Sequence, residues 1–374
     1  MNYKRIKNGL EHRANRFINE RRGWKTDRKI VVIESDDWGS IRMPNRQVYE
    51  ATLAKGIPAD KCHYCKYDTL ATADDFSAMY DVLRQHKDKN GNNPMITANT
   101  IVANPDFEKI KQDDFQNYHY ELFTETLDKY LNTSFELWKQ GVEEQLFFPQ
   151  LHGREHLNVE RWLKALQDNS IEAHFAFEHG FFGISTTISQ ENNPSFMAAL
   201  DFDSEEGKRF GNQAINEACH IFENIFGYRS KSFIGPNYFW HDETEDVLAS
   251  NDVPYLQGGY VQKLPNQIKH HYLGQRNQHK QIYLIRNVQF EPAGIETGDL
   301  VAQTVAQIDK AFKLGKPAII STHRVAFIGA IFEENRTKNL RMLNELLGKI
   351  IKKWPDVEFM NSVQLGNLVS GTEK

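Results

Sequence analysis

Short apolar runs alternate with amphipathic stretches along most of this chain. Lys29 to Glu34 is an unbroken run dominated by β-branched residues, which predicts a strand buried on both faces. Residues 94–102, 145–151 and 317–322 have a similar character and predict further buried strands. Strands are also expected over residues 171–177, 231–234, 254–257, 282–285 and 357–360.

Apolar residues at helical spacing lie between these runs. Residues 159–167, 304–314 and 339–354 predict amphipathic helices, and Asn158 is a suitable N-cap for the first of them. Strands that alternate with helices form a mostly parallel sheet that is covered on both faces. About seven to nine such units favour an α/β barrel over an open sheet.

A basic N-terminal segment, residues 1–28, precedes the barrel domain, which we assign to residues 29–374. Apolar spacing predicts a helix over residues 3–22. Residues 1–29 contain ten Lys or Arg but three Asp or Glu. This helix either packs on the domain surface or contacts an anionic membrane or a partner protein. Residues 52–93 and 103–140 are expected to be insertions around the barrel core.

Charge and cysteine content narrow the class of protein. The formal net charge of -5 over 374 residues argues against a dedicated nucleic-acid-binding protein. Cys62, Cys65 and Cys219 give no disulfide framework and indicate a reducing compartment. The basic N-terminus lacks the apolar run of a secretory signal, and no stretch approaches the roughly 18 apolar residues of a membrane span. We therefore expect a cytoplasmic protein.

Ionisable residues suited to catalysis lie where predicted strands end. Asp36 and Asp37 follow the first buried run, His152 ends another with His156 shortly after it, and His323 ends the run before it. Taken singly, an Asp-Asp pair is ordinary turn chemistry, and a lone histidine is more often a core residue. Parallel α/β folds bind ligands at the carboxyl ends of strands, so the shared position indicates one site.

Asp37, His152 and His156 match the ligand set of a catalytic divalent metal. Two imidazoles four residues apart can face one cation, and a carboxylate from another strand completes a facial set of three. Such a set leaves positions for water and substrate, unlike a closed structural site. The ligand types suit zinc, and cobalt or nickel would also fit.

These motifs resemble, in their order, those of the polysaccharide deacetylase family, also called the NodB-homology or carbohydrate esterase 4 type. The family's first motif ends in two aspartates, as Ser35-Asp36-Asp37 does, and its second is a histidine pair spaced like His152 and His156. Its third centres on a Pro–Tyr pair, to which Pro236-Asn237-Tyr238 is similar. Its last is an apolar strand that ends in a histidine, as the strand before His323 does.

The resemblance covers about residues 29–325 and implies a distorted (β/α)7 TIM-like barrel with insertions. The chain also departs from the family pattern. Its third motif lacks the family's arginine, and Gln257-Gly258-Gly259 stands about where the fourth motif, an aspartate near a tryptophan, is expected. Arg286 and Glu291 are the candidates for the partner that orients His323.

The family's roles, carried onto the matching residues, describe a metal-dependent deacetylase. It would remove N-acetyl or O-acetyl groups from a sugar or polysaccharide precursor with one divalent metal ion, most simply zinc. Asp36 would be the general base, and protonated His323 would be the general acid for the leaving amine. A backbone N–H near Tyr238 would help to bind the oxyanion.

Three alternatives stay open at the level of sequence. The same barrel could hydrolyse a non-sugar amide, for instance a cyclic one, or could be a catalytically degenerate carbohydrate-binding protein. A glycoside hydrolase would need two carboxylates astride the bond, for which Glu155 and Glu178 are the candidates.

Two other patterns have competing interpretations. Most aromatic residues pack in cores, but five near the motifs could stack on a sugar ring: Trp38, Phe182, Tyr238, Phe239 and Trp240. Cys62-His63-Tyr64-Cys65 has the spacing of a metal knuckle. The chain lacks a second such pair, so we do not expect a structural zinc site.

Overall fold

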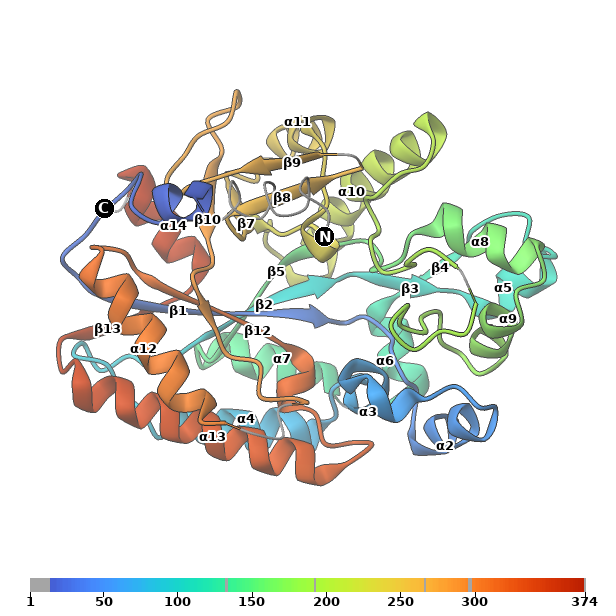
Figure 1. Ribbon diagram of the computed structural model, residues 1–374, viewed down its shortest axis with the longest axis horizontal. Helices are drawn as coiled ribbons and strands as arrows, with labels where there is room; N and C mark the ends of the chain where they lie inside the picture. Colours follow the sequence, from blue (N-terminus) through green and yellow to red (C-terminus); the bar gives the residue numbers. More distant parts are fainter. Residues whose placement is uncertain (1–13, 132–133, 192, 266, 295–297, 373–374) are drawn as a thin grey trace, which may run out of the picture.

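One parallel sheet curls into a distorted, partly open barrel (Figure 1). The computed structural model describes residues 14–372 apart from 132–133, 192, 266 and 295–297. The sheet contains β1 (Lys29–Trp38), β2 (Ile96–Ile101), β5 (Phe147–Gly153), β6 (Ser232–Phe233), β7 (Tyr255–Gly258), β10 (Ile282–Ile285), β11 (Val288–Gln289), β12 (Ala318–His323) and β13 (Val357–Met360). The predicted α/β class and TIM-like barrel are confirmed.

The order of neighbouring strands explains the curled shape. Hydrogen-bonded neighbours run β10-β7-β6-β5-β2-β1-β12-β11, all parallel, and β13 pairs with β1 as well. The two ends of this path, β10 and β11, are consecutive in the chain and are joined by only Arg286 and Asn287. The sheet therefore turns almost back on itself and brings β10 near β1.

Alternate residues of β1 serve two separate cores. Val31 and Ile33 pack in one core, whereas Ile30 and Val32 pack in another. Both faces of the strand are apolar, which is why its sequence runs without hydrophobic alternation. The helices that complete the first core are α4 (Ala73–Arg84), α7 (Ser134–Glu143), α12 (Leu300–Lys313) and α13 (Glu333–Lys353). Those of the second are α10 (Glu205–Phe226), α11 (Asp242–Ser250) and α14 (Ser362–Ser370).

Shorter elements gather at the carboxyl ends of the strands, toward which the arrowheads of β1 and β2 point in Figure 1. The helices there are α2 (Arg46–Ala54), α3 (His63–Tyr67), α5 (Phe107–Gln112), α6 (Phe123–Tyr130), α8 (Val159–Gln167) and α9 (Ile171–Glu178). Two hairpins, β3 (Ala103–Pro105) with β4 (Tyr120–Leu122) and β8 (Val261–Leu264) with β9 (Gln267–His270), lie outside the barrel sheet. Short 3-10 turns are η1 (Ala59–Lys61), η2 (Pro236–Tyr238) and η3 (Arg324–Phe327).

The strand predicted over residues 171–177 is wrong, because this segment forms helix α9. Ser170 caps the helix by accepting a hydrogen bond from the Ala173 N–H. A short apolar run does not distinguish a buried strand from a buried helix, and in this segment the Ser170 N-cap favours the helix. Residues 52–93 and 103–140 also differ from expectation, since they supply α4 and α7 to the outer layer of the barrel.

The N-terminal segment is described only from residue 14, so most of the predicted helix over residues 3–22 lies outside the described part. Glu20 forms an ion pair with Lys310, and Lys316 donates to the backbone oxygen of Trp24, which fastens the segment to the barrel. Contact with a membrane or partner stays a prediction.

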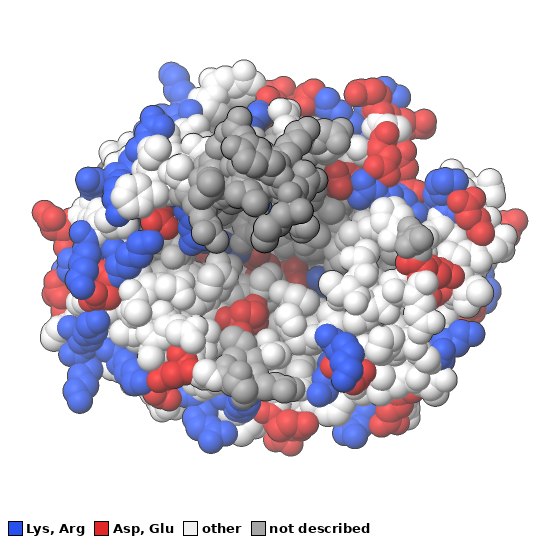
Figure 2. Space-filling model, viewed as in Figure 1, with Lys and Arg blue, Asp and Glu red and all other residues white. Residues whose placement is uncertain are grey.

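Within the described residues, no helix is long and apolar enough to cross a membrane. Acidic and basic side chains are interspersed on the face drawn in Figure 2.

Candidate active site

The two aspartates stand at an irregular end of β1. Its pairing with β2 shifts register between Ser35 and Trp38, as at a β-bulge. Asp37 lies inside this shift and has a φ of 73°, in the left-handed region that few non-glycine residues adopt. On the other side of β1, Asp36 is in register with His323 of β12. The irregularity allows two consecutive carboxylates to serve different partners.

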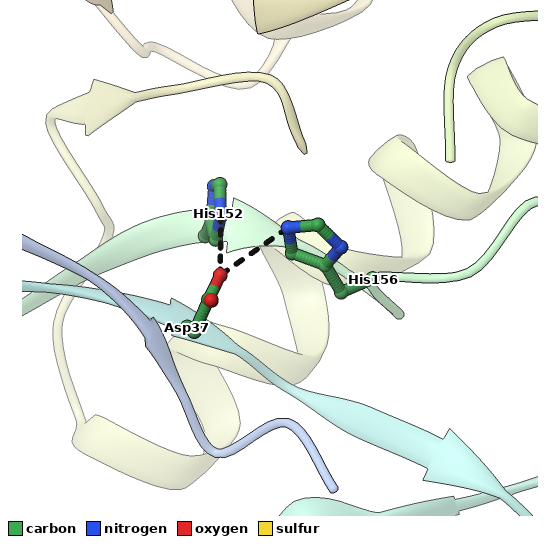
Figure 3. A group of neighbouring side chains, drawn as sticks. All are labelled: Asp37, His152 and His156. Atoms are coloured by element: carbon green, nitrogen blue, oxygen red, sulfur yellow. Dashed lines mark ion pairs between the residues drawn. The ribbon is translucent and has the colours of Figure 1, made fainter. Parts of the chain in front are cut away.

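Asp37, His152 and His156 come together as the sequence predicted (Figure 3). Oδ1 of Asp37 lies 3.5 Å from Nε2 of His152 and 3.2 Å from Nε2 of His156. All three residues are buried, and one ligand atom from each lies within 4.8 Å of the others. This set has the ligand types and the spacing that a divalent cation requires.

The hydrogen bonding of His152 shows which of its nitrogens is available. Nδ1 lies 2.8 Å from the carbonyl oxygen of Ile234, which fixes the ring and makes Nδ1 the protonated nitrogen. Its Nε2 is buried and has no hydrogen-bond partner among the described residues. A buried lone pair without a donor is costly unless it has another partner, so this atom fits the role of a metal ligand.

Arg42 contacts the Asp37 carboxylate at the oxygen that does not face the histidines. Its guanidinium contacts Oδ2 of Asp37 at 2.9 Å and lies 3.5 Å from Asp68, which leaves Oδ1 of Asp37 to face the histidines. Burial alone would raise the pKa of Asp37, but Arg42 and the imidazole of His156 hold it well below its ordinary value. Burial also lowers the pKa of His156. An ionised carboxylate and a neutral imidazole are the states that bind metal.

Asp36 is held by a buried arginine that lies 250 positions further along the chain. Arg286, at the end of β10, contacts both carboxylate oxygens of Asp36 at 2.6 Å and Glu34 at 2.6 Å. Asn99 donates a further hydrogen bond to Asp36 at 2.8 Å. Burial would raise the pKa of Asp36, but the charge and hydrogen bonds of Arg286 outweigh it and keep this pKa far below its ordinary range. Asp36 is therefore ionised at neutral pH.

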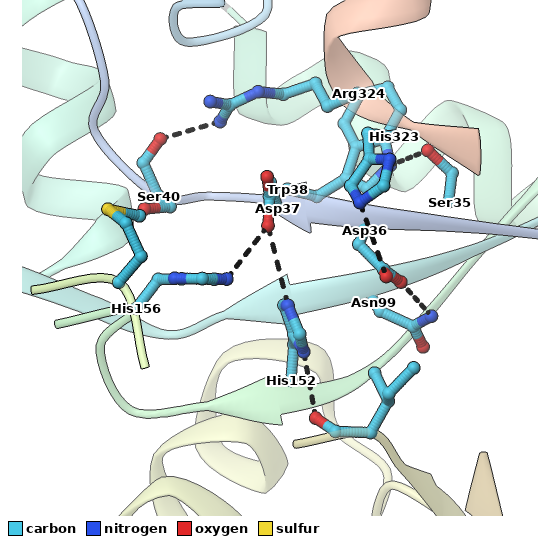
Figure 4. Close-up of polar contacts among 12 residues, drawn as sticks. Ser35, Asp36, Asp37, Trp38, Ser40, Asn99, His152, His156, His323 and Arg324 are labelled. Carbon is cyan, nitrogen blue, oxygen red and sulfur yellow. Dashed lines mark hydrogen bonds and ion pairs between the residues drawn. The ribbon is translucent and has the colours of Figure 1, made fainter. Parts of the chain in front are cut away.

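His323 has Glu291 as its partner. Nδ1 of His323 lies 2.5 Å from Glu291, and Nε2 lies 4.0 Å from Asp36 (Figure 4 shows His323 beside Asp36). Burial alone would lower the pKa of His323, but the charges of Glu291 and of the two aspartates raise it to about 9. The ring is thus protonated at neutral pH. Of the two candidates, Glu291 contacts His323, while Arg286 contacts Asp36.

A cavity of about 310 Å³ is lined both by the possible metal ligands and by the Asp36–His323 pair. Its wall includes the five residues Asp36, Asp37, His152, His156 and His323. Tyr238 also lines the cavity, in the 3-10 turn η2, but its N–H donates to the carbonyl oxygen of Gly235 at 2.9 Å. That N–H would have to leave this bond to take part in an oxyanion hole.

Three of the five aromatic residues considered as sugar platforms are core residues instead. Trp38, Phe182 and Trp240 are at most 2% exposed. Trp38 packs against the rings of Phe76 and Phe147 and donates to the Ser35 hydroxyl, so it serves the fold. None of the three lines the cavity, whereas Tyr238 does.

The carboxylates considered for a glycoside hydrolase do not flank the cavity. Glu155 is buried in an ion pair with Arg154, and Glu178 is an exposed partner of Lys111. Neither belongs to the cavity wall. A pair of catalytic carboxylates at these positions is therefore not supported.

Arg42 is the supporting residue that sequence reasoning missed. It follows the Asp36-Asp37 pair by five positions, and its role depends on a turn that the sequence does not reveal. The signal for Arg286 was stronger, because an arginine directly after the apolar run 282–285 falls at a strand end. Neither residue could be matched to its aspartate without the fold.

Comparisons with known proteins find likeness to solved structures alone. No family model matches the chain, and no curated protein matches it. Similar solved structures include one described as a polysaccharide deacetylase from Mycobacterium smegmatis (11% identity, 94% of this chain and 93% of that one, TM-score 0.45). PuuE allantoinase (10% identity, 94% and 93%, TM-score 0.46) and 4-alpha-glucanotransferase from Thermococcus litoralis (8% identity, 90% and 40%, TM-score 0.46) are also similar.

The first of these proteins is of the kind that the sequence motifs resemble. All three scores are nevertheless below 0.5, and the reactions that the names imply differ from one another. Likeness at this level carries no argument about activity. The functional case therefore rests on the residues of this chain.

Proposed function

We propose that this protein is a metal-dependent hydrolase that cleaves an amide bond. Its substrate would be an N-acetylated sugar or a small polysaccharide precursor. The observation that carries the proposal is the buried group of Asp37, His152 and His156, whose ligand atoms lie within 4.8 Å of one another at the wall of a cavity. An acid–base pair, Asp36 and His323, lines the same cavity.

The three ligands have the support that a catalytic cation site needs. Arg42 keeps Asp37 ionised, and the Ile234 carbonyl directs Nε2 of His152 inward. A divalent cation held there, zinc for preference, would act as a Lewis acid toward a carbonyl oxygen and would acidify a water molecule.

Asp36 and His323 divide the proton transfers between them. Asp36 would accept a proton from the attacking water as general base. Arg286 weakens it as a base, and an acidified water offsets that weakness. His323 would donate its proton to the leaving nitrogen, because an amine anion is a very poor leaving group. Its contact with Glu291 keeps that proton in place at neutral pH.

The size of the cavity bears on the substrate. A volume of about 310 Å³ is at the small end of ligand pockets, which run from roughly 300 to 1,000 Å³. This favours one sugar residue, or another small amide, over a segment of polymer. Hydrolysis of a small non-sugar amide is therefore the second candidate function.

Metal analysis and a substrate panel test the proposal together. We expect about one divalent ion per chain after reloading, and release of acetate from an N-acetylated monosaccharide that stops after chelation. Turnover of small cyclic amides alone would favour the second candidate. Absence of a stoichiometric ion would refute the proposal, and an ion without turnover on either panel would indicate a binding protein.

A further inference from the structure

A pair of cysteines lies in the wall of the same cavity and has no part in the proposed hydrolysis. Cys62 precedes helix α3 as its N-cap residue, and Cys65 lies in the first turn of that helix. Both are free thiols, both are about nine-tenths buried, and both line the cavity. Among the described residues, no third Cys, His, Asp or Glu joins them in a possible metal group, so the knuckle interpretation has no support.

The two thiols shift each other's pKa in opposite directions. The Cys65 thiol donates a hydrogen bond to the sulfur of Cys62, and the Ser185 hydroxyl donates to that sulfur as well. These bonds outweigh burial and lower the pKa of Cys62 to about 5, while the pKa of Cys65 is raised. Cys62 therefore has the character of a thiolate and Cys65 that of its neighbouring resolving thiol.

We propose that Cys62 and Cys65 form a site of reversible oxidation, at which a peroxide converts the two thiols into one disulfide on the cavity wall. Cys62 at the N-cap and Cys65 at the third helical position are three residues apart, a spacing that within a helix places Cβ atoms roughly 5–6 Å apart. A disulfide needs about 3.5–4.5 Å between the Cβ atoms, so the start of the helix must tighten by roughly 1–2 Å to close the bond. The cavity gives a small oxidant access to the sulfurs.

The chemistry takes two steps. The Cys62 thiolate attacks a peroxide oxygen, so that an S–O bond forms, the O–O bond breaks and the departing hydroxide takes up a proton to leave as water. The Cys65 thiol then loses its proton and attacks the oxidised Cys62 sulfur, so that an S–S bond forms, the S–O bond breaks and the departing hydroxide takes up that proton to leave as a second water. One peroxide is reduced by two electrons and two thiols become one disulfide, which an external dithiol reverses.

The oxidation would reach the catalytic side of the cavity through Tyr64. This residue stands between the two cysteines, and its ring lies edge-on to His323 with centroids 5.4 Å apart. The Arg42 guanidinium lies 5.9 Å from the centroid of the same ring. We expect a tightening of the turn to shift Tyr64 and so to alter its contacts with both residues. This consequence, unlike the disulfide itself, rests on the proposed function.

Thiol counting on the whole protein tests the disulfide independently of any hydrolase activity. Reduced protein is treated with hydrogen peroxide, quenched in acid, unfolded, alkylated and mapped by mass spectrometry. We expect Cys62 and Cys65 to lose alkylation together, with a mass loss of two hydrogens in the peptide that holds both, and a dithiol to restore them. Cys219, whose pKa burial raises to about 12, is expected to react at least about tenfold more slowly.

Single substitutions separate the disulfide from general oxidation. Cys219→Ser is expected to form the linked pair as the wild type does. Cys65→Ser is expected to stop at oxygen adducts on Cys62 or a mixed disulfide, and Cys62→Ser is expected to leave Cys65 reduced. Disulfides between chains, or equal rates of loss at all three cysteines, would overturn the proposal. Loss of turnover on oxidation in the wild type but not in Cys65→Ser is the result expected if Tyr64 transmits the change.

Discussion

The cavity has a cation side, formed by Asp37, His152 and His156, and an acid–base side, formed by Asp36 and His323. The two sides are assembled in different ways. The cation side takes its three ligands from β1 and from the end of β5 and the following loop, and among the described residues Arg42 is the one further charged residue that forms an ion pair with them. The acid–base side depends on two ion pairs, Asp36 with Arg286 and His323 with Glu291, and Arg286 lies 250 positions from Asp36. The ligands of the first side are thus marked in the sequence by strand ends and a four-residue spacing, whereas the second side depends on a balance between charges that are distant in the chain.

This difference predicts which substitutions act through the cation and which act through protonation. Changes on the cation side are expected to remove metal and activity together. Changes on the acid–base side are expected to leave metal in place and to alter rate, stability or pH dependence.

The largest effect is expected for His152→Ala. Loss of one of three ligands removes stoichiometric binding, so the rate is expected to fall by more than the roughly 100-fold that loss of an outer-shell partner costs. Elemental analysis and acetate release measure both quantities. The control is His279→Ala, which breaks an exposed contact with Asp246. A His152→Ala protein that keeps one ion per chain would show that the ligand set is assigned wrongly.

Asp36→Asn is expected to give the next largest effect. The amide keeps the shape of the side chain but cannot accept the proton, and general base catalysis is worth about 10²–10⁴-fold. Metal content is expected to stay at the wild-type value, which separates this variant from His152→Ala. Unchanged turnover with metal bound would exclude Asp36 as the base.

Arg286→Met tests the charge balance of the acid–base side through stability. It leaves Glu34 and Asp36 buried without their cation, and breaking a buried pair costs about 3–5 kcal/mol of unfolding free energy. Denaturant unfolding measures the loss. The matched control is Arg84→Met, whose pair with Glu144 is partly exposed and is expected to contribute about 0–1 kcal/mol. Equal losses in the two variants would show that Arg286 has no special role.

The same contrast explains how far sequence predicts this molecule. Asp37, His152 and His156 could be proposed as a group because strand ends and a four-residue spacing are local signals. The partners Arg286 and Glu291 could be named but not matched to Asp36 and His323, because the match depends on how the sheet curls from β10 back toward β1. Helix α9 was mistaken for a strand because its apolar run is short and its decisive feature is the Ser170 cap.

Glu291→Gln is expected to have the smallest effect and the most specific one. Glu291 raises the pKa of His323 to about 9, so the protonated acid is present below that pH and is lost as the pH rises through it. Glutamine can still accept a hydrogen bond from His323 but carries no charge. The pKa is therefore expected to fall toward the ordinary value of about 6.5, with a loss of up to roughly 30-fold in rate at pH 8 and of less than about twofold at pH 6.

The measurement is kcat/KM against pH for the wild type and the variant, both loaded with the same metal. A bound cation lowers the pKa of His323 in both proteins, so the direction of the difference between them depends only on the charge at Glu291. Glu178→Gln, which removes an exposed carboxylate paired with Lys111, is expected to leave the profile in place. If the alkaline limb does not move in Glu291→Gln, another group sets it, and the acid–base side does not depend on the His323–Glu291 pair.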